Sequence, residues 1–356
     1  MRGAIIPALA LGLPLLWPGH LAAQPAQPAA LDPALLAQTL DKAAKLPRLR
    51  ALIVARHGKS LVERVFRGPG LDVPVNVKSV SKTVISALVG AAIDRGVLEG
   101  PDQPIAPLLP DQLPKRTDPR LARVTIGHLL SMRSGLERTS GRNYGRWVQS
   151  RNWVRFVLAR PLVEEPGTAM QYSTGNSHLL SAVLTRAAGR STLELARAWL
   201  AAPLGFALQP WQTDPQGIYL GGNNMRLSPR ALLRIGEMYR NGGRHRGRQV
   251  ISRAWVRASW VPRAVSPYSG DGYGYGWFIT AACGHPVFYA RGFGGQFIYV
   301  VPTLELTIVL TSTTTTRTRI GGYRTALKSL VGSGIIAAAR RADAGALAPA
   351  PADCML

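Results

Sequence analysis

Acidic residues are scarce in this chain. Its 356 residues include 19 Asp and Glu against 43 Lys and Arg, which gives a formal net charge of +24, and only seven of the basic residues are lysines. A nucleic-acid-binding protein usually gathers its basic residues into one patch, often with aromatic side chains between them. Here the arginines are spread along the whole chain, so the charge indicates attraction to anionic surfaces rather than a nucleic-acid partner.

Long apolar runs without charge are missing after the first residues, which argues against a later membrane-spanning helix. Residues 1–23 are typical of a secretory signal peptide, with an apolar run from Ala4 to Trp17 and small residues before the expected cleavage point. An uncleaved membrane anchor is the alternative, but the breaks at Pro7 and Pro14 favour the signal peptide. We therefore expect a periplasmic or secreted protein, in which residues 24–33, rich in Ala, Pro and Gln, form a flexible lead-in.

Cysteines are also few, so at most one disulfide can form within the chain. The two cysteines are Cys283 and Cys354, and export would place them where a disulfide persists. Cys354 lies in an Ala- and Pro-rich end, residues 343–356, that we expect to be a flexible tail. Pairing would fix this tail to the domain, and two unpaired thiols are the equal alternative.

The length and a hydrophobic content of 46% suit a globular domain with one large core rather than a disordered or fibrous chain. Two apolar segments between Leu52 and Phe66 predict a β-hairpin, and aromatic and β-branched segments from 274 to 312 predict consecutive antiparallel strands. Helical patterns fill residues 98–220 and return at 323–341. We therefore expect an α+β domain over residues 34–342, with an antiparallel sheet flanked by helices and a mainly helical lobe inserted at about 98–220.

One serine and one lysine stand three residues apart at the start of a predicted helix. Ser79 and Lys82 are the only such pair among the seven lysines, and their spacing places both side chains on one helix face. A serine hydroxyl becomes an effective nucleophile when a neighbouring group takes its proton, and a lysine of lowered pKa can do this. Taken alone, the pair favours an ordinary helix start capped by serine.

A loop at residues 165–176 contains Tyr172 and leads into a helical pattern. A tyrosine that enters a cleft can act as a phenolate base or a proton relay if nearby positive charge lowers its pKa from about 10. If Tyr172 is considered without the other motifs, a tyrosine that only packs the loop is favoured.

Four stretches of the chain occur in a recognisable order. They are Ser79-Val80-Ser81-Lys82, residues 124–136, residues 165–180 with Tyr172, and Ala290 to Gln296. Their order and spacing resemble the serine β-lactamase-related, penicillin-binding-protein-like superfamily, especially its class C β-lactamase, esterase and 6-aminohexanoate-oligomer hydrolase branch. The resemblance covers nearly all of the mature chain, and it implies a β-lactamase/transpeptidase-like fold and a serine hydrolase without metal or organic cofactor.

The resemblance also implies a role for individual residues. Ser79 is expected to attack an amide or ester carbonyl, and Lys82 and Tyr172 to transfer the protons. The backbone N–H groups of Ser79 and Phe293 are expected to hold the oxyanion. The expected substrate-binding residues are Thr174, Asn176, Gly292 and Arg291.

Two positions depart from the family pattern. Thr174 stands where the family usually has Asn, and Ala290 stands where a Lys or His holds the substrate carboxylate of β-lactams and peptidoglycan stems. Side chains alternate between the two faces of a strand, so Ala290 and Gly292 are predicted to face the cleft and Arg291 to face away. An alternative alignment, in which residues 293–295 match the motif, supplies no cation either. The missing cation favours another small-molecule or peptide-like amide or ester over a β-lactam.

Other kinds of site find less support in the sequence. The chain has no Gly-x-Ser-x-Gly elbow, and its six histidines show no metal-binding spacing. His128 and His178 lie on helical patterns with leucines, which favours buried structural roles. The remaining alternatives are a non-catalytic penicillin-binding-like ligand sensor or scaffold, and a true β-lactamase or D-Ala-D-Ala peptidase.

Overall fold

The computed structural model describes Met1 and residues 31–116, 118–314, 320–344 and 354–356. The predicted signal peptide beyond Met1 and most of the predicted lead-in lie outside the described residues. Among the helices that are described, none is long and apolar enough to cross a membrane.

An eight-stranded sheet forms the centre of the fold, and each pair of neighbouring strands in it is antiparallel. The N-terminal hairpin joins the C-terminal strands through the pairing of β1 with β12, which confirms the predicted single sheet. In spatial order the strands are β2 (Lys59–Val65), β1 (Leu49–Arg56), β12 (Leu306–Ser312), β11 (Gln296–Val301), β10 (His285–Gly292), β9 (Phe278–Ala282), β8 (Gly272–Tyr273) and β7 (Ala264–Val265). Two short ribbons lie outside this sheet: β3 (Val75–Asn76) with β4 (Arg226–Leu227), and β5 (Arg244–His245) with β6 (Arg248–Gln249).

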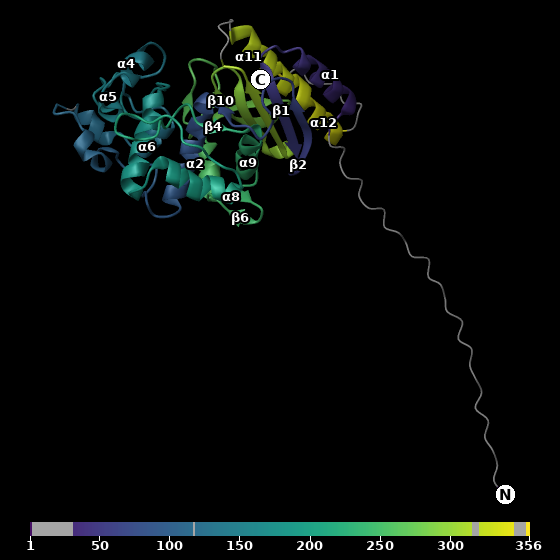
Figure 1. Cartoon of the computed structure of the whole chain (residues 1–356), viewed down its shortest axis with the longest axis horizontal. Helices are drawn as coiled ribbons and strands as arrows, with labels where there is room; N and C mark the ends of the chain where they lie inside the picture. Colours follow the sequence, from purple (N-terminus) through teal and green to yellow (C-terminus); the bar gives the residue numbers. More distant parts are fainter. Residues whose placement is uncertain (2–30, 117, 315–319, 345–353) are drawn as a thin grey trace.

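Alternating side chains of the central strands divide the core between the two faces of the sheet. Ile53 and Ile298 belong to one buried cluster, together with helix α9 (Pro229–Arg240). Leu52 and Tyr299 belong to a second cluster on the other face. The helical segments that cover this second face are α1 (Pro33–Ala44), α11 (Ile320–Ser329), a π-helical segment (Leu330–Ile336) and α12 (Ala337–Ala344), as Figure 1 shows.

A mainly helical lobe lies beside the sheet, with the buried helix α2 (Ser81–Ile93) between them (Figure 1). In the lobe Trp147 and Trp153 pack against His178, whose Nε2 lies 3.0 Å from a carboxylate oxygen of Asp214. This buried pair gives His178 a structural role. The helices of the lobe are α3 (Ile126–Leu130), α4 (Tyr144–Val148), α5 (Trp153–Leu158), α6 (Thr174–Ala188), α7 (Thr192–Ala196) and α8 (Ala202–Leu204); α10 (Arg253–Ser259) follows β6.

A disulfide joins Cys283, in the turn between β9 and β10, to Cys354 near the end of the chain. Residues 345–353 of the predicted flexible tail lie outside the described residues, but Cys354 after them is buried. Its carbonyl packs against Gly332, where any Cβ would stand 2.2 Å from the oxygen. The described end of the chain is therefore fixed to the domain.

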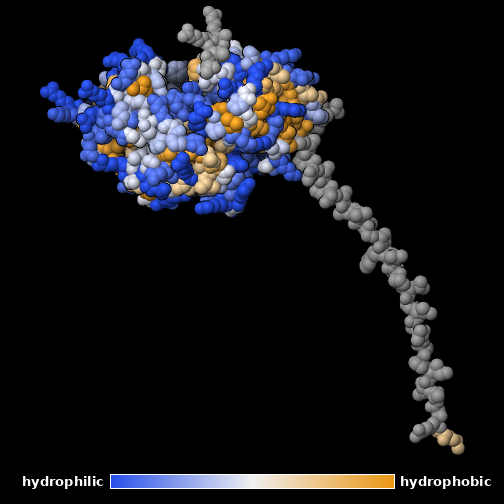
Figure 2. Space-filling view, in the orientation of Figure 1, coloured by the Kyte–Doolittle hydropathy of each residue, from blue (hydrophilic) through white to orange (hydrophobic). Residues whose placement is uncertain are grey.

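The face of the domain that is seen in Figure 2 is mostly hydrophilic. Figure 2 shows hydrophilic residues over most of the face seen in Figure 1, with hydrophobic ones gathered near the sheet and the C-terminal helices. Arginines form ion pairs on well-separated elements, such as Arg186 with Asp111 and Arg240 with Glu305. Part of the positive charge is thus neutralised locally.

Candidate active site

Ser79 lies in one 3-10 turn, Lys78–Val80, directly before α2. Lys78 has a left-handed backbone (φ 52°), a conformation that non-glycine residues rarely adopt. Two hydrogen bonds hold it: the N–H of Lys78 donates to Oδ1 of Asn76 (2.9 Å), and its carbonyl accepts from Oγ of Ser81 (2.6 Å). The predicted helix therefore begins with a tighter turn that places Ser79 among the free N–H groups of the helix start.

Lys82 lies buried directly behind Ser79, with 3% of its surface exposed. Its Nζ lies 3.1 Å from Oγ of Ser79, 3.3 Å from Oγ1 of Thr174 and 2.6 Å from the carbonyl oxygen of Gly222. None of these partners is a carboxylate, so burial lowers the pKa of Lys82 to about 7. At neutral pH a large fraction of the molecules therefore holds an uncharged amine beside Ser79.

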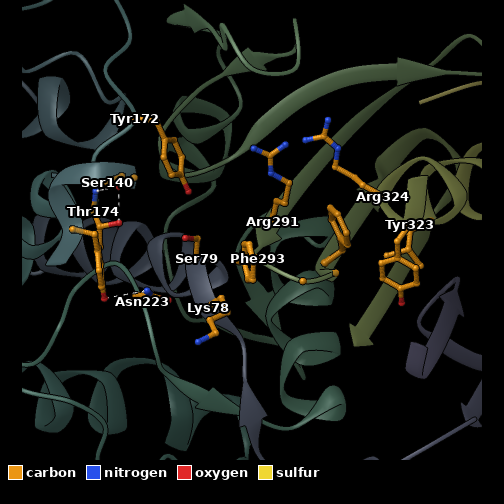
Figure 3. A pocket seen from close by; sticks show the side chains of 17 residues that line it. Lys78, Ser79, Ser140, Tyr172, Thr174, Asn223, Arg291, Phe293, Tyr323 and Arg324 are labelled. Carbon is orange, nitrogen blue, oxygen red and sulfur yellow. Dashed lines mark hydrogen bonds between the residues drawn. The ribbon is translucent and has the colours of Figure 1, made fainter. Parts of the chain in front are cut away.

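Tyr172 completes the group at the cavity wall, and Figure 3 shows its hydroxyl directed toward Ser79. Nζ of Lys82 lies 5.0 Å from the centroid of the Tyr172 ring, which stacks on Phe278. Burial raises the pKa of Tyr172, and its hydrogen bond with Ser79 and the charge of Arg291 offset this only in part. The phenol therefore stays protonated at neutral pH, so the condition for a phenolate base is not met.

Thr174 and Asn176, two of the predicted substrate-binding residues, share the first turn of α6 but differ in surroundings. Thr174 lines the cavity, and its Oγ1 lies 3.0 Å from Oγ of Ser140. Asn176 is fully buried and does not line the cavity; its Oδ1 accepts a hydrogen bond from Oγ of Ser134 (3.1 Å). The assignment of Asn176 to substrate binding is therefore corrected: its side chain supports the loop of Ser134.

Ser79 and Tyr172 open onto one cavity of about 430 Å³ (Figure 3). Gly292 lets the end of β10 approach the turn of Ser79, because a Cβ on it would stand 2.2 Å from the carbonyl oxygen of Val77. Phe293 follows on the cavity wall and is 56% exposed. Within the described chain, no group of three His, Cys, Asp or Glu is placed to hold a metal ion.

Several cavity residues were not predicted from the sequence. Gly222 is separated from Lys82 by 140 residues, and its loop carries no motif that marks it as part of the site. Asn223, the next residue along this loop, lines the cavity. Residues of α11, near the C-terminal end of the chain, also line it. The unpredicted lining residues that the structure adds include Ser140, Tyr144, Asn223, Tyr323 and Arg324.

The side chains of β10 alternate as predicted, and Gly292 lines the cavity, but Arg291 rather than Ala290 lies beside it there. Ala290 packs into the core cluster of α9, whereas Arg291 lines the cavity with its guanidinium carbon 4.6 Å from the ring centroid of Phe278. The expectation that Arg291 faces away from the cleft is therefore wrong. Alternation separates the two faces of a strand, but it does not say which face borders the cavity.

Known proteins are similar to this chain in sequence and in fold. The family model described as Beta-lactamase matches residues 47–332, which is most of the chain. This chain belongs to the beta-lactamase family. The matched region contains the whole eight-stranded sheet, the helical lobe and the three residues Ser79, Lys82 and Tyr172.

Relatives in the beta-lactamase family include two curated enzymes. EstB, an esterase of Burkholderia gladioli, is 32% identical over 203 residues, which cover 49% of this chain and 51% of EstB. The 6-aminohexanoate-dimer hydrolase of Paenarthrobacter ureafaciens is 26% identical over 255 residues, covering 66% of this chain and 64% of that protein. The chain thus spans between half and two thirds of the length of these relatives.

Solved structures of low sequence identity share the fold. EstCE1, a hydrolase with promiscuous acyltransferase activity, has a TM-score of 0.67 at 19% identity, covering 84% of this chain and 96% of EstCE1. The octameric penicillin-binding protein homologue from Pyrococcus abyssi has a TM-score of 0.66 at 17% identity, covering 86% and 80% of the two chains. The β-lactamase-like fold expected from the motifs is confirmed.

Proposed function

We propose that this chain is an exported serine hydrolase that cleaves amide or ester bonds of small-molecule or peptide-like substrates through an acyl-enzyme on Ser79. The observation that carries the proposal is the approach of the buried Nζ of Lys82 to within 3.1 Å of Oγ of Ser79, at the wall of a cavity. Membership of the beta-lactamase family and the names of two relatives, an esterase and a 6-aminohexanoate-dimer hydrolase, support the same chemistry.

In acylation, Oγ of Ser79 attacks the substrate carbonyl while its proton passes to the neutral amine of Lys82. A neutral amine has two N–H groups and one lone pair. The carbonyl of Gly222 and the hydroxyl of Thr174 can accept the two N–H groups, which leaves the lone pair for the proton of Ser79. The backbone N–H groups of Ser79 and Phe293 donate to the oxyanion of the tetrahedral intermediate.

Tyr172 is the proton donor on the leaving-group side. Its phenol is protonated at neutral pH, and its hydroxyl faces Ser79. It gives its proton to the departing alcohol or amine, and the proton held by Lys82 then restores the phenol. In deacylation a water molecule loses a proton to Lys82 and attacks the acyl carbon; the bond to Oγ breaks, and Ser79 regains its proton.

Export is part of the proposal. The pattern of residues 1–23 supports secretion, and a disulfide between Cys283 and Cys354 fits an oxidising compartment such as the periplasm. The absence of a Lys or His at Ala290 supports amides or esters other than β-lactams as substrates.

Turnover of a substrate panel by matched variants tests the proposal. The panel contains short 4-nitrophenyl esters, linear amides, D-amino-acid peptides and a chromogenic cephalosporin. We expect ester or amide hydrolysis by the wild type and by Ser60→Ala, whose hydroxyl is exposed on β2 and outside the cavity lining. In Ser79→Ala we expect a loss of at least about a thousandfold. Tyr172→Phe is expected to be severely slowed.

Three outcomes would count against this function. Full activity of Ser79→Ala would exclude an acyl-enzyme on Ser79. Ligand binding without turnover of any panel member would favour a sensor or scaffold. Cephalosporin hydrolysis faster than that of every ester and amide would favour a true β-lactamase.

A further inference from the structure

One stretch of the chain is rich in arginine and almost without acidic residues. Residues 226–263 contain ten arginines, and Glu237 is their one acidic residue. In the fold this stretch contains helix α9, the hairpin of β5 and β6, and helix α10. Arginines occur along the whole chain, but the excess of positive charge is greatest on these consecutive elements.

Four of the ten arginines are engaged within the protein. Arg230 and Arg240 form ion pairs. Arg226 donates to a backbone carbonyl, and the guanidinium group of Arg263 lies over a tyrosine ring. Among the described residues no carboxylate pairs with the other six, which are Arg234, Arg244, Arg246, Arg248, Arg253 and Arg257.

The hairpin carries three of these six arginines into the solvent. Its strands are joined by a two-residue turn, Arg246-Gly247, in which both residues have positive φ (46° and 77°), as tight hairpin turns require. A Cβ on Gly247 would meet no atom within 4 Å, so the turn projects into open space. Arg244 and Arg248 flank the turn, and all three arginines are exposed.

The other three arginines extend the positive charge beyond the hairpin. Arg253 lies against its base, because a Cβ on Gly242 would stand 3.3 Å from Nε of this arginine. Arg257 follows one turn later on the same face of α10. Burial lowers the pKa of His245 in β5, and the charges of Arg246 and Arg234 lower it further. We call these six arginines the basic surface.

The carboxylates nearest to the basic surface are already bound. Glu237 forms an ion pair with Arg240 at 2.8 Å. Asp94 accepts a hydrogen bond from the N–H of Ser252 at 2.7 Å, at the start of α10. The basic surface is therefore left to attract an external anion.

An uncharged, partly exposed segment lies beside the basic surface. Helix α9 contacts both β5 and α8, and Nη1 of Arg234 donates to the carbonyl oxygen of Gly205 at the end of α8. Figure 1 shows α8 and β6 at the same edge of the domain. Residues 198–207 contain no charged residue, and their apolar side chains that reach the solvent are those of Ala198, Trp199, Ala202, Pro203, Phe206 and Ala207.

We propose that the basic surface and residues 198–207 together dock the protein on an anionic lipid bilayer. Guanidinium groups donate paired N–H groups to headgroup phosphates, and aromatic side chains next to basic ones favour the level of the headgroups. A soluble polyanion would engage the arginines but would leave the apolar segment in water. This docking goes beyond the proposed hydrolase function and does not depend on it.

Sedimentation with lipid vesicles tests the proposal. The purified full chain is mixed with vesicles of phosphatidylcholine alone, or with about 30% phosphatidylglycerol, at an ionic strength of about 0.1 M. The readout is the ratio of the partition coefficients for the two kinds of vesicle. All variants keep the same N-terminal residues, so any lipid binding by those residues is common to all of them.

Two triple variants separate the basic surface from the net charge. The first changes Arg244→Gln, Arg246→Asn and Arg248→Gln, with Asn chosen because it tolerates the positive φ of the turn. We expect its ratio to fall on the order of a hundredfold, since each arginine at an anionic surface contributes roughly fivefold. The control changes Arg116, Arg151 and Arg155, three exposed arginines of the helical lobe, to Gln and is expected to lower the ratio less than about threefold.

Two more variants keep the test decisive. Thermal denaturation checks that each variant folds, and if the hairpin variant does not, Arg253→Gln with Arg257→Gln is expected to lower the ratio roughly tenfold or more. Phe206→Ala is expected to lower partitioning into the anionic vesicles several-fold and to leave binding of soluble polyphosphate unchanged.

Three results would overturn the proposal. A wild-type ratio near one would exclude docking on anionic lipid. An equal fall in the two triple variants would assign the binding to the net charge of the whole protein. Unchanged vesicle binding by Phe206→Ala, together with tight binding of polyphosphate by the wild type, would assign the basic surface to soluble polyanions instead of a bilayer.

Discussion

In the proposed mechanism the enzyme is active only when the amine of Lys82 is uncharged. Burial lowers the pKa of this lysine from 10.5 to about 7. At pH 7 about half of the molecules then carry the neutral amine, whereas a lysine of ordinary pKa would be neutral in roughly one molecule in 3,000. Since only the neutral amine can accept the proton of Ser79, kcat/KM is expected to fall about tenfold per unit below about pH 6 and to level off above about pH 8.

The assay for this prediction is the initial rate of 4-nitrophenyl pentanoate hydrolysis between about pH 5 and pH 9. Absorbance is read at the isosbestic wavelength of the nitrophenol product, ionic strength is constant, and the rate with Ser79→Ala is subtracted to remove hydrolysis by hydroxide. Tyr172→Phe is the control: its rates are lower, but its midpoint stays near 7 because the titrating group is Lys82. A profile that is flat down to pH 5, or a midpoint at pH 9 or above, would refute the reasoning.

Three further predictions concern a neighbour of Lys82, the packing of α2 and the disulfide. Thr174→Val removes a hydroxyl 3.3 Å from Nζ of Lys82, so the ammonium loses an acceptor. The midpoint of the same pH profile is expected to move down and kcat/KM at pH 8 to fall roughly tenfold. An unchanged profile would show that the contact has no role. Gly90→Ala places a Cβ 2.3 Å from the ring of Trp255, and urea denaturation is expected to show that the free energy of unfolding falls by about 1–3 kcal/mol. Gly100→Ala, which has open space around it, is expected to change this free energy by less than about 0.5 kcal/mol. Equal stability of the two variants would contradict the close packing of α2. Reduction of the Cys283–Cys354 disulfide opens a loop with a sequence separation of 71. Thermal denaturation with reductant is therefore expected to show that the free energy of unfolding falls by up to about 4 kcal/mol. A transition at an unchanged temperature would argue against the disulfide.

The sheet and the Ser79–Lys82 pair were predictable because each depends on a short pattern. Apolar runs bounded by turn residues mark the hairpin and the C-terminal strands, and antiparallel pairing then closes one sheet. A spacing of three residues at a helix start brings a lysine next to a serine, and their atoms meet at 3.1 Å. The family motifs added the position of Tyr172, which no periodicity indicates.

The surroundings of these residues were not predictable, because they depend on tertiary packing. Gly222 accepts from Lys82 across 140 residues, and no local pattern announces it. Alternation placed Arg291 and Ala290 on opposite faces correctly, but Arg291 lines the cavity and Ala290 packs into the core, which is the reverse of the expectation for these two residues. The burial of Tyr172 outweighs the nearby positive charge, so the pKa of its hydroxyl is raised. A role as phenolate base would have required a lowered pKa.

Covalent labelling with a fluorophosphonate tests whether Ser79 is the nucleophile, because the phosphorus takes the place of the substrate carbonyl and the adduct on a nucleophilic serine is stable. The purified full chain is labelled, its residual ester hydrolysis is measured, and the adduct is mapped by peptide mass spectrometry. We expect one label per chain, on Ser79, with activity lost in proportion to labelling and no label in Ser79→Ala. A label on another residue that abolishes activity, or full activity in a chain labelled at Ser79, would contradict it.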